Sequence, residues 1–327
     1  MNSFGRIFRI SIFGESHGAC LGITIDGVPS GIALQGSDFT TDITRRQTGS
    51  TGASKRIESD IPQIVSGWFN GYTTGAPLTI VFQNVNFNSA EYEKIKAIPR
   101  PGHADFVADR KFKGYNDYRG GGHFSGRLTL ALVAAGVIAK KIIRTVNLKT
   151  EIISINGNKN IRNSIADAIE KKDSVGGIVE CRVTGIPVGW GEPFFDSIES
   201  VISHLVFSIP GIKGIEFGAG FASASMYGSQ HNDSLENRDG KTATNNSGGI
   251  SGGITNGNEL IFRVAVKPVS SIEKTQKSFN FETNQIEEFE IGGRHDVSIV
   301  LRVPVIIEAV TAIALADFFQ NSCKTTL

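Results

Sequence analysis

The chain has 327 residues, a formal net charge of +1 and a hydrophobic share of 40%. These values are typical of a soluble globular protein with one large or two medium domains. The even charge balance gives no long-range attraction to nucleic acid or to a membrane, so neither partner is predicted. Three scattered cysteines without a CxxC pair argue against a disulfide framework or a zinc ribbon, and they fit a reducing cytoplasm.

The N-terminal segment predicts two strands, Phe8–Phe13 and Leu21–Ile25, and no signal peptide. The loop between them, Gly14-Glu15-Ser16-His17-Gly18, holds three polar side chains between glycines. Histidine is suited to proton transfer near neutral pH, so His17 is a candidate acid or base. Capping of the turn is the alternative role for this histidine.

The next segment predicts a short helix at Asp38–Arg46 that ends in Arg45-Arg46, followed by a basic loop. Guanidinium groups bind oxyanions bidentately, so these arginines suit a phosphate or a carboxylate. A solvated basic surface is the alternative. A hairpin follows, with Asn70-Gly71 at its turn.

The stretch from Pro99 to Arg144 contains three different features in a row. His103 lies in a Pro-Gly turn with Asp105 two residues later, and a basic, aromatic loop then ends in Gly120-Gly121-Gly122. An apolar helix follows at Leu128–Ile143, with Ser125 as its N-cap. Glycines before a helix N-terminus predict an anion site at the head of this helix.

Within that helix, Ala134, Ala135 and Gly136 permit close approach of another helix. After Arg144, further strands and helices alternate without a linker, so a single interwoven domain is predicted. Strand-hairpin-helix units in both halves leave an internal duplication open. The predicted strands are 146–155, 177–183, 212–217, 254–266 as a hairpin, and 299–305; the predicted helices are 161–172, 196–207 and 307–319, with an exposed charged excursion at 273–288.

Three glycine-flanked polar clusters lie far apart in the sequence: GESHG, RPGHAD and GGRHD, the last with Arg294, His295 and Asp296. Together with the arginines they predict acid/base chemistry on a polyanionic substrate. A serine hydrolase is disfavoured because no GxSxG is present, and no metal site is predicted because no HxxxH or HEXXH spacing occurs. Gly218-Ala219-Gly220-Phe221 lacks the third glycine of a dinucleotide-binding fingerprint.

Along almost its entire length, the chain closely resembles the chorismate synthase family. The resemblance rests on several long motifs in the family's order. They are Gly14–Gly18 with Asp26-Gly27-Val28-Pro29, Arg100–Asp105, Asp117–Gly122, Ser125-Gly126-Arg127, Pro187-Val188-Gly189, Gly191-Glu192-Pro193, Lys267-Pro268 with Ser270-Ser271, and Gly293-Arg294-His295-Asp296.

The resemblance implies a carbon-oxygen lyase that performs the last step of the shikimate pathway, in aromatic amino-acid biosynthesis. The substrate is then 5-enolpyruvylshikimate 3-phosphate, and an anti 1,4-elimination gives chorismate and phosphate. The reaction needs reduced FMN without net redox change, and NADPH enters only indirectly, for flavin reduction.

The resemblance also implies roles for individual residues. His17 protonates the departing phosphate with Ser16 as a relay, His103 faces the flavin, and Asp296 helps flavin N5 take the ring proton. The implied substrate-binding residues are Arg45, Arg46, Ser125, Arg127 and Arg294. The implied FMN-binding residues are His123, Phe124, Ser125, Gly252, Lys267, Pro268, Val269, Ser270, Ser271 and Arg294.

The family's fold is α+β, a β-α-β sandwich with antiparallel sheets enclosing central helices, which implies one domain over residues 1–327. A cytoplasmic homotetramer is expected, and an external flavin reductase is left open as a further partner. Four positions depart from the family's pattern. His123-Phe124 replaces an Arg-Ser pair, Thr48 stands where Pro is usual, and Val297 follows Asp296 where Pro is usual.

Two other readings remain. A non-catalytic flavin- or phosphosugar-binding protein would retain the fold without turnover, and the altered flavin contacts at His123-Phe124 support it. Against it stand His17, His103 and Asp296, which are all present. A nucleic-acid-binding module is disfavoured by the neutral charge and by the lack of a basic aromatic face.

Overall fold

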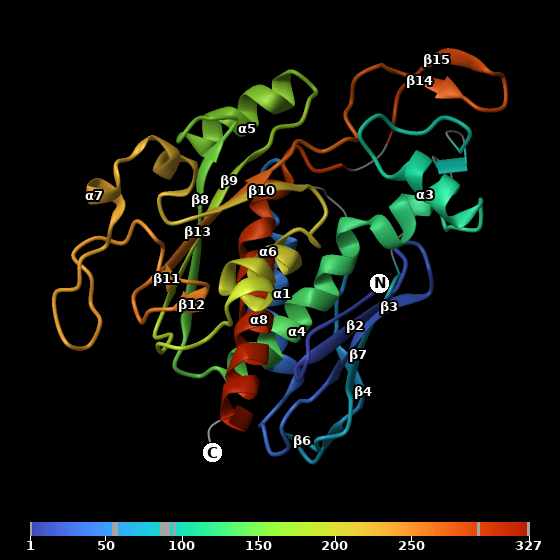
Figure 1. Cartoon of the computed structure of the whole chain (residues 1–327). Helices are drawn as coiled ribbons and strands as arrows, with labels where there is room; N and C mark the ends of the chain where they lie inside the picture. Colours follow the sequence, from blue (N-terminus) through green and yellow to red (C-terminus); the bar gives the residue numbers. More distant parts are fainter. Residues whose placement is uncertain (1, 54–57, 86–91, 94–95, 293–294, 326–327) are drawn as a thin grey trace.

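Two antiparallel sheets flank a pair of long helices (Figure 1). The computed structural model describes residues 2–53, 58–85, 92–93, 96–292 and 295–325. The larger sheet has the strand order β1-β2-β3-β7-β4, and the smaller one has the order β10-β13-β9-β8. Antiparallel sheets together with helices confirm the predicted α+β class.

The bounds of the strands follow in sheet order. The larger sheet contains β1 (Ser3–Phe4), β2 (Arg9–Gly14), β3 (Cys20–Asp26), β7 (Leu78–Gln83) and β4 (Gln63–Ser66). The smaller sheet contains β10 (Ile212–Phe217), β13 (Leu260–Val266), β9 (Gly177–Thr184) and β8 (Asn147–Ile155). Three two-stranded pairs are β5 (Trp68–Phe69) with β6 (Tyr72–Thr73), β11 (Ile250–Ser251) with β12 (Ile254–Thr255), and β14 (Gln276–Asn280) with β15 (Gln285–Phe289).

The helices connect and cover these sheets. The α-helices are α1 (Thr40–Gln47), α3 (Asp105–Phe112), α4 (Thr129–Ile142), α5 (Ile161–Glu170), α6 (Ile198–Val206), α7 (Gly228–His231) and α8 (Val303–Thr325). The 3-10 turns are η1 (Gly36–Phe39), η2 (Arg119–Phe124), η3 (Gly126–Leu128), η4 (Phe194–Asp196), η5 (Gly220–Ser225) and η6 (Ile299–Leu301).

Alternation of side chains explains why each sheet buries one face. In β13 every second residue, including Leu260, Phe262 and Val264, is buried, whereas Arg263 is partly exposed. Successive strand residues point to opposite faces, so the apolar set covers the core. Full burial of each such side chain contributes about 1.5–3 kcal/mol.

The helices α4 and α8 form the centre of the molecule (Figure 1). They pack on each other, while α4 also contacts β3 of the larger sheet and α8 contacts β8 and β9 of the smaller sheet. The apolar stretch Val303–Cys323 of α8 is long enough to cross a membrane by length and composition, but 83% of its most apolar window is buried inside the protein. It therefore acts as a core helix here.

Most predicted strands and helices are confirmed to within a few residues, but two predictions in the chain's irregular stretches are wrong. The predicted strand 299–305 is η6 followed by the start of α8, because a short buried apolar run is compatible with either structure. The exposed excursion predicted at 273–288 is confirmed, since most of its residues are exposed, and it contains the β14-β15 hairpin, which the sequence did not predict. The loop after His103 contains α3, whose acidic first turn and basic last turn suit a helix.

Two predictions are wrong in detail. Ser125 caps the short turn η3 that leads into α4, because its Oγ accepts a hydrogen bond from the backbone N of Arg127 at 3.3 Å, and Leu128 is the residue before α4. In the predicted hairpin 254–266, β12 pairs with β11, and β13 pairs instead with β9 and β10. The hairpin turn at Asn70-Gly71 is confirmed, since β5 pairs with β6 across it.

Close approach of α4 and α8 at Gly136 confirms the prediction made from the small residues of this helix. A Cβ added at Gly136 would lie 2.5 Å from the Cα of Ala309 in α8. Gly136→Ala is therefore expected to lower the free energy of unfolding by about 1–3 kcal/mol, as overpacking does. Urea unfolding tests this, with Gly228→Ala as the control because a Cβ there meets open space. Equal stability of the two variants would contradict the close packing.

Candidate active site

The three consecutive glycines of η2 bring two distant histidines together. Gly120, Gly121 and Gly122 all have positive φ, at 60°, 82° and 53°. A Cβ on Gly120 would lie 2.6 Å from Nε2 of His17, and one on Gly121 would lie 3.1 Å from Cε1 of His103. The glycines thus admit both imidazole rings against one stretch of backbone, where any side chain would displace them.

His17 occupies a buried turn after β2. It is 4% exposed, its neighbour Ser16 is 1% exposed, and its ring meets Tyr92 edge-on at 5.3 Å between centroids. The backbone N of Ser16 donates to the carbonyl of Gly122 at 3.1 Å, which ties this turn to the glycines. The side chain of Asn84 donates to the carbonyls at both ends of the turn, Glu15 and Gly18, at 3.0 and 2.9 Å.

His103 is oriented by a carboxylate. Its Nδ1 lies 2.5 Å from Oδ1 of Asp105, and Arg100 grips the same carboxylate with Nε and Nη2 at 2.7 and 2.8 Å. Burial alone would raise the pKa of Asp105, but the hydrogen bonds from Arg100 and His103 outweigh it and hold the pKa well below its usual range. An ionised Asp105 fixes the proton on Nδ1, so Nε2 of His103 is the nitrogen left for chemistry.

A cavity of about 270 Å³ adjoins these histidines and is rich in cationic side chains. Four arginines contribute to its wall from different parts of the chain: Arg46, Arg100, Arg127 and Arg302. Ser16, Gly120 and Tyr92 also line it, whereas His17 lies one layer behind, against Gly120 and Tyr92. Such a wall suits a ligand with several oxyanions.

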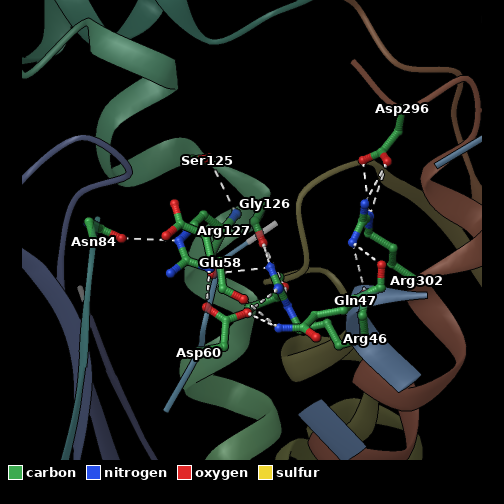
Figure 2. A network of polar contacts seen from close by, with 11 residues as sticks. Arg46, Gln47, Glu58, Asp60, Asn84, Ser125, Gly126, Arg127, Asp296 and Arg302 are labelled. Atoms are coloured by element: carbon green, nitrogen blue, oxygen red, sulfur yellow. Dashed lines mark hydrogen bonds and ion pairs between the residues drawn. The ribbon is translucent and has the colours of Figure 1, made fainter. Parts of the chain in front are cut away.

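Arg127 is held by the side chains of Asp60 and Asn84 (Figure 2). Nη1 pairs with Oδ1 of Asp60 at 2.6 Å, and Nε donates to Oδ1 of Asn84 at 3.1 Å. Nη2 is buried and has no hydrogen-bond partner among the described residues. A buried donor without a partner costs about 1–3 kcal/mol, which a ligand oxyanion in the cavity would recover.

Arg46 lies beside Arg127 and is buried as deeply (Figure 2). Its Nε donates to Oγ1 of Thr129 at 3.0 Å, and its Nη2 donates to the carbonyls of Gly126 and Arg127. Its Nη1 lies 3.9 Å from Oδ2 of Asp60. Burial lowers the pKa of Arg46 to about 10, against the opposing effect of Asp60. The guanidinium is therefore charged at neutral pH and adds a second cation to the same wall.

The opposite part of the cavity is formed by His295 and Asp296. Arg302 pairs with the carboxylate of Asp296 at 3.0 Å (Figure 2). Burial lowers the pKa of His295, so its ring is neutral at pH 7, and its Nε2 has no hydrogen-bond partner among the described residues. The cavity thus combines four arginines, a neutral imidazole and the three carboxylates of Glu58, Asp60 and Asp296.

A larger cavity of about 620 Å³ shares Gly120, Ser125 and Val269 with the first. His123, Phe124 and the loop 267–270 line it, together with strands β1 and β2. Nζ of Lys267 donates to the carbonyl of Gly102 at 2.6 Å and to Oγ of Ser270 at 3.1 Å. Burial and the nearby Lys213 both lower the pKa of Lys267, and both lysines line the cavity.

Comparison with known proteins identifies the family. The family model described as "Chorismate synthase" matches residues 8–320. A chorismate synthase of Chitinophaga pinensis is 60% identical over 319 residues, which cover 97% of this chain and 96% of that protein. The chain belongs to the chorismate synthase family.

More distant relatives and a solved structure agree. Chorismate synthases of Dehalococcoides mccartyi and Methanocaldococcus jannaschii are 42% and 41% identical, over 97% of this chain and 96% of each relative. A crystal structure of chorismate synthase superposes with a TM-score of 0.74 at 25% identity, over 98% of this chain and 93% of the other. As a member of the family, the chain is a lyase of the shikimate pathway and of aromatic amino-acid biosynthesis, and the family implies a flavin requirement.

The structure gathers most of the side chains that the sequence singled out for the chorismate synthase site. Arg46, Ser125, Arg127, Ser16 and Asp296 line the smaller cavity. The predicted residues that line the larger cavity are His103, His123, Phe124, Ser125, Lys267, Pro268, Val269 and Ser270.

Other predicted residues do not reach the chorismate synthase cavities. Arg45 points away and pairs with Glu308 at 2.7 Å on the far side of α1. Gly252 lies in the turn between β11 and β12 and lines neither cavity. Ser271 lies behind the wall, where its Oγ accepts from Arg100 at 3.2 Å. Arg294 lies outside the described residues.

His123, which departs from the family's pattern, contacts other residues of the protein through both ring nitrogens. Its Nδ1 lies 2.8 Å from the carbonyl of Gly14, and its Nε2 lies 3.1 Å from Oδ1 of Asn2. His123 therefore fastens the N-terminal strands to η2, a structural contact that the sequence pattern did not indicate.

Proposed function

We propose that the chain catalyses the anti 1,4-elimination of phosphate from 5-enolpyruvylshikimate 3-phosphate, giving chorismate. The observation that carries the proposal is the arrangement at Gly120 and Gly121, where two histidines meet beside an arginine-lined cavity. The substrate carries a phosphate and two carboxylates, and the arginines of the cavity wall are complementary to such a polyanion. Family membership supports the same reaction.

We assign the acid role to His17. Elimination leaves phosphate with an additional charge on oxygen, and a proton from His17 neutralises it. Ser16 lines the cavity while His17 lies behind Gly120, so the hydroxyl of Ser16 is well situated to relay the proton. Arg46 and the unpartnered Nη2 of Arg127 hold the oxyanions, and Ser125 lines the same wall.

The larger cavity suits FMN by its chemistry. Its volume of about 620 Å³ falls in the range of small-molecule sites, and it combines apolar side chains with two lysines that can bind a phosphate. We propose that His123, Phe124, Ser125 and the loop 267–270 hold the flavin. When bound, reduced FMN supplies electron density to the substrate. Nε2 of His103 would face it, and the carboxylate of Asp296 would assist removal of the proton lost from the ring.

We further propose the remaining family features for this chain. They are a single domain over residues 1–327 with the β-α-β sandwich architecture, an internal duplication, and a homotetramer in the cytoplasm whose flavin is reduced by an external reductase or by NADPH. The adjacent rings of Phe194 and Phe195 are 85% and 92% exposed, an apolar surface that supports subunit contact. Light scattering tests the assembly.

Anaerobic incubation of the protein with 5-enolpyruvylshikimate 3-phosphate tests the reaction, with and without chemically reduced FMN. We expect chorismate only with reduced FMN. Repeating the assay with NADPH and oxidised FMN distinguishes intrinsic from external flavin reduction. A substrate-induced change in the flavin spectrum without product would instead favour the non-catalytic binding protein.

A further inference from the structure

One side chain that no family motif above includes connects the two sides of the smaller cavity. Arg302 lies between η6 and α8 and is largely buried, with 16% of its side chain exposed. Its Nε donates to Oδ1 and Oδ2 of Asp296 at 3.1 and 3.2 Å, and its Nη2 donates to Oδ1 at 3.0 Å. Its Nη1 donates to the carbonyls of Arg46 and Gln47 at 3.0 and 2.9 Å (Figure 2).

The backbone around Asp296 is held without Arg302. The N of Val297 donates to the carbonyl of Gly52 at 2.8 Å, and the carbonyl of Val297 accepts from the N of Val175 at 3.0 Å. Loss of the guanidinium would therefore remove three contacts from the carboxylate while leaving its loop in place. These three contacts act on the direction of the Asp296 side chain.

Arg46 is likewise held by contacts of its own. Three hydrogen bonds to Thr129, Gly126 and Arg127 fix its guanidinium, and Arg302 touches only its backbone carbonyl. Removal of Arg302 should therefore change substrate binding far less than it changes the position of Asp296. This difference separates a positioning role from a general structural one.

We propose that Arg302 is a positioning residue that aims the carboxylate of Asp296 into the cavity, at a fixed place relative to the substrate held by Arg46. The proposal rests on the proposed function, in which Asp296 assists removal of the ring proton. A group that assists a proton transfer must be placed within hydrogen-bond distance of its partner. The planar guanidinium suits this task because it contacts both carboxylate oxygens and the C-terminus of α1 at once.

The test is a double-mutant cycle of Arg302→Met and Asp296→Asn, with Arg302→Lys as the conservative variant. Arg263→Met is the matched control, because Arg263 also joins a carboxylate, Glu216 at 2.8 Å, to a carbonyl, Gly218 at 2.6 Å, and lines neither cavity. Anaerobic chorismate formation with reduced FMN gives kcat. Calorimetry with oxidised FMN gives the Kd for substrate.

Arg302→Met is expected to lower kcat by about 10- to 100-fold, the effect of misplacing a reacting group by about 1 Å. The Kd for substrate should change less than about threefold, and a substrate deuterated at the carbon that loses its proton should show a larger isotope effect. In the Asp296→Asn background, Arg302→Met should lower kcat less than about twofold, because the two residues act as one unit. Arg302→Lys should be intermediate.

The proposal would be overturned if the losses of kcat in the two single variants multiplied in the double variant, or if Arg302→Met and Arg263→Met lowered kcat equally. If Arg302→Met fails to fold, the cycle is completed with Arg302→Lys. A further measurement does not depend on turnover: the ¹³C resonance of the Asp296 carboxylate, assigned by its loss in Asp296→Asn, should move in the Arg302 variants. An unmoved resonance overturns the proposal. Inactivity of the wild type with reduced FMN instead contradicts only the proposed function.

Discussion

His17→Ala is expected to lower kcat by about 10²- to 10⁴-fold, the scale on which a general acid contributes. The ring lies behind the cavity wall, against Gly120, so its loss removes the proposed proton donor. Binding of FMN should be retained, because His17 does not line the larger cavity. Anaerobic chorismate formation with reduced FMN measures the rate, and flavin fluorescence measures the binding.

His231→Ala is the matched control, since this histidine lies on α7 and lines neither cavity. It should leave kcat unchanged. Added imidazole should restore part of the activity of His17→Ala, because the substitution leaves a space of imidazole size beside Gly120. A wild-type rate in His17→Ala would exclude His17 as the acid and move that role to another group of the wall.

The sequence singles out both histidines because their signals are local. His17 and His103 each lie in a short glycine-flanked loop. The loop pattern predicts an exposed side chain, but the structure buries His17 at 4% exposure against Gly120. The sequence predicts that the glycines at 120–122 approach a ligand, and the structure shows that Gly120 and Gly121 also leave room for side chains. They admit the two imidazole rings, which the sequence could not indicate without the fold.

The sequence does not choose between Arg45 and Arg46. Consecutive residues of a helix point about 100° apart, so at most one of them can face the cavity. In the structure Arg46 faces it, whereas Arg45 pairs with Glu308 of α8. Which arginine faces the cavity depends on how α1 packs against α4 and α8, and no local sequence pattern predicts this packing.

The partners of the site arginines are equally hidden. Asp60 is 67 residues away from Arg127 in sequence and lies in a loop without a recognisable motif. Arg302 falls in a run that predicted a strand, and the structure shows the start of α8 there. Such residues act by holding other side chains, so only tertiary structure identifies them.

Asp60→Asn is expected to lower the free energy of unfolding by about 3–5 kcal/mol, the cost of breaking a buried ion pair. Asp60 is 3% exposed, and its carboxylate pairs with Arg127 at 2.6 Å and lies 3.9 Å from Arg46. Asparagine retains the shape but leaves two buried guanidiniums without their counter-charge. Urea unfolding measures the change. Glu259→Gln is the control, because it breaks an exposed pair with Arg182 and should cost about 0–1 kcal/mol.

The double variant Asp60→Leu with Arg127→Leu separates stability from function. Apolar replacement of both members of a buried pair is often neutral for stability, so most of the loss in Asp60→Asn should disappear. The double variant should bind 5-enolpyruvylshikimate 3-phosphate more weakly than the wild type, because it lacks the buried Nη2 of Arg127. A stable double variant that still binds substrate tightly would show that Arg127 is structural alone. The expected result, a stable protein without affinity, implies that the buried charge is retained at a cost in folding because the anionic substrate requires it.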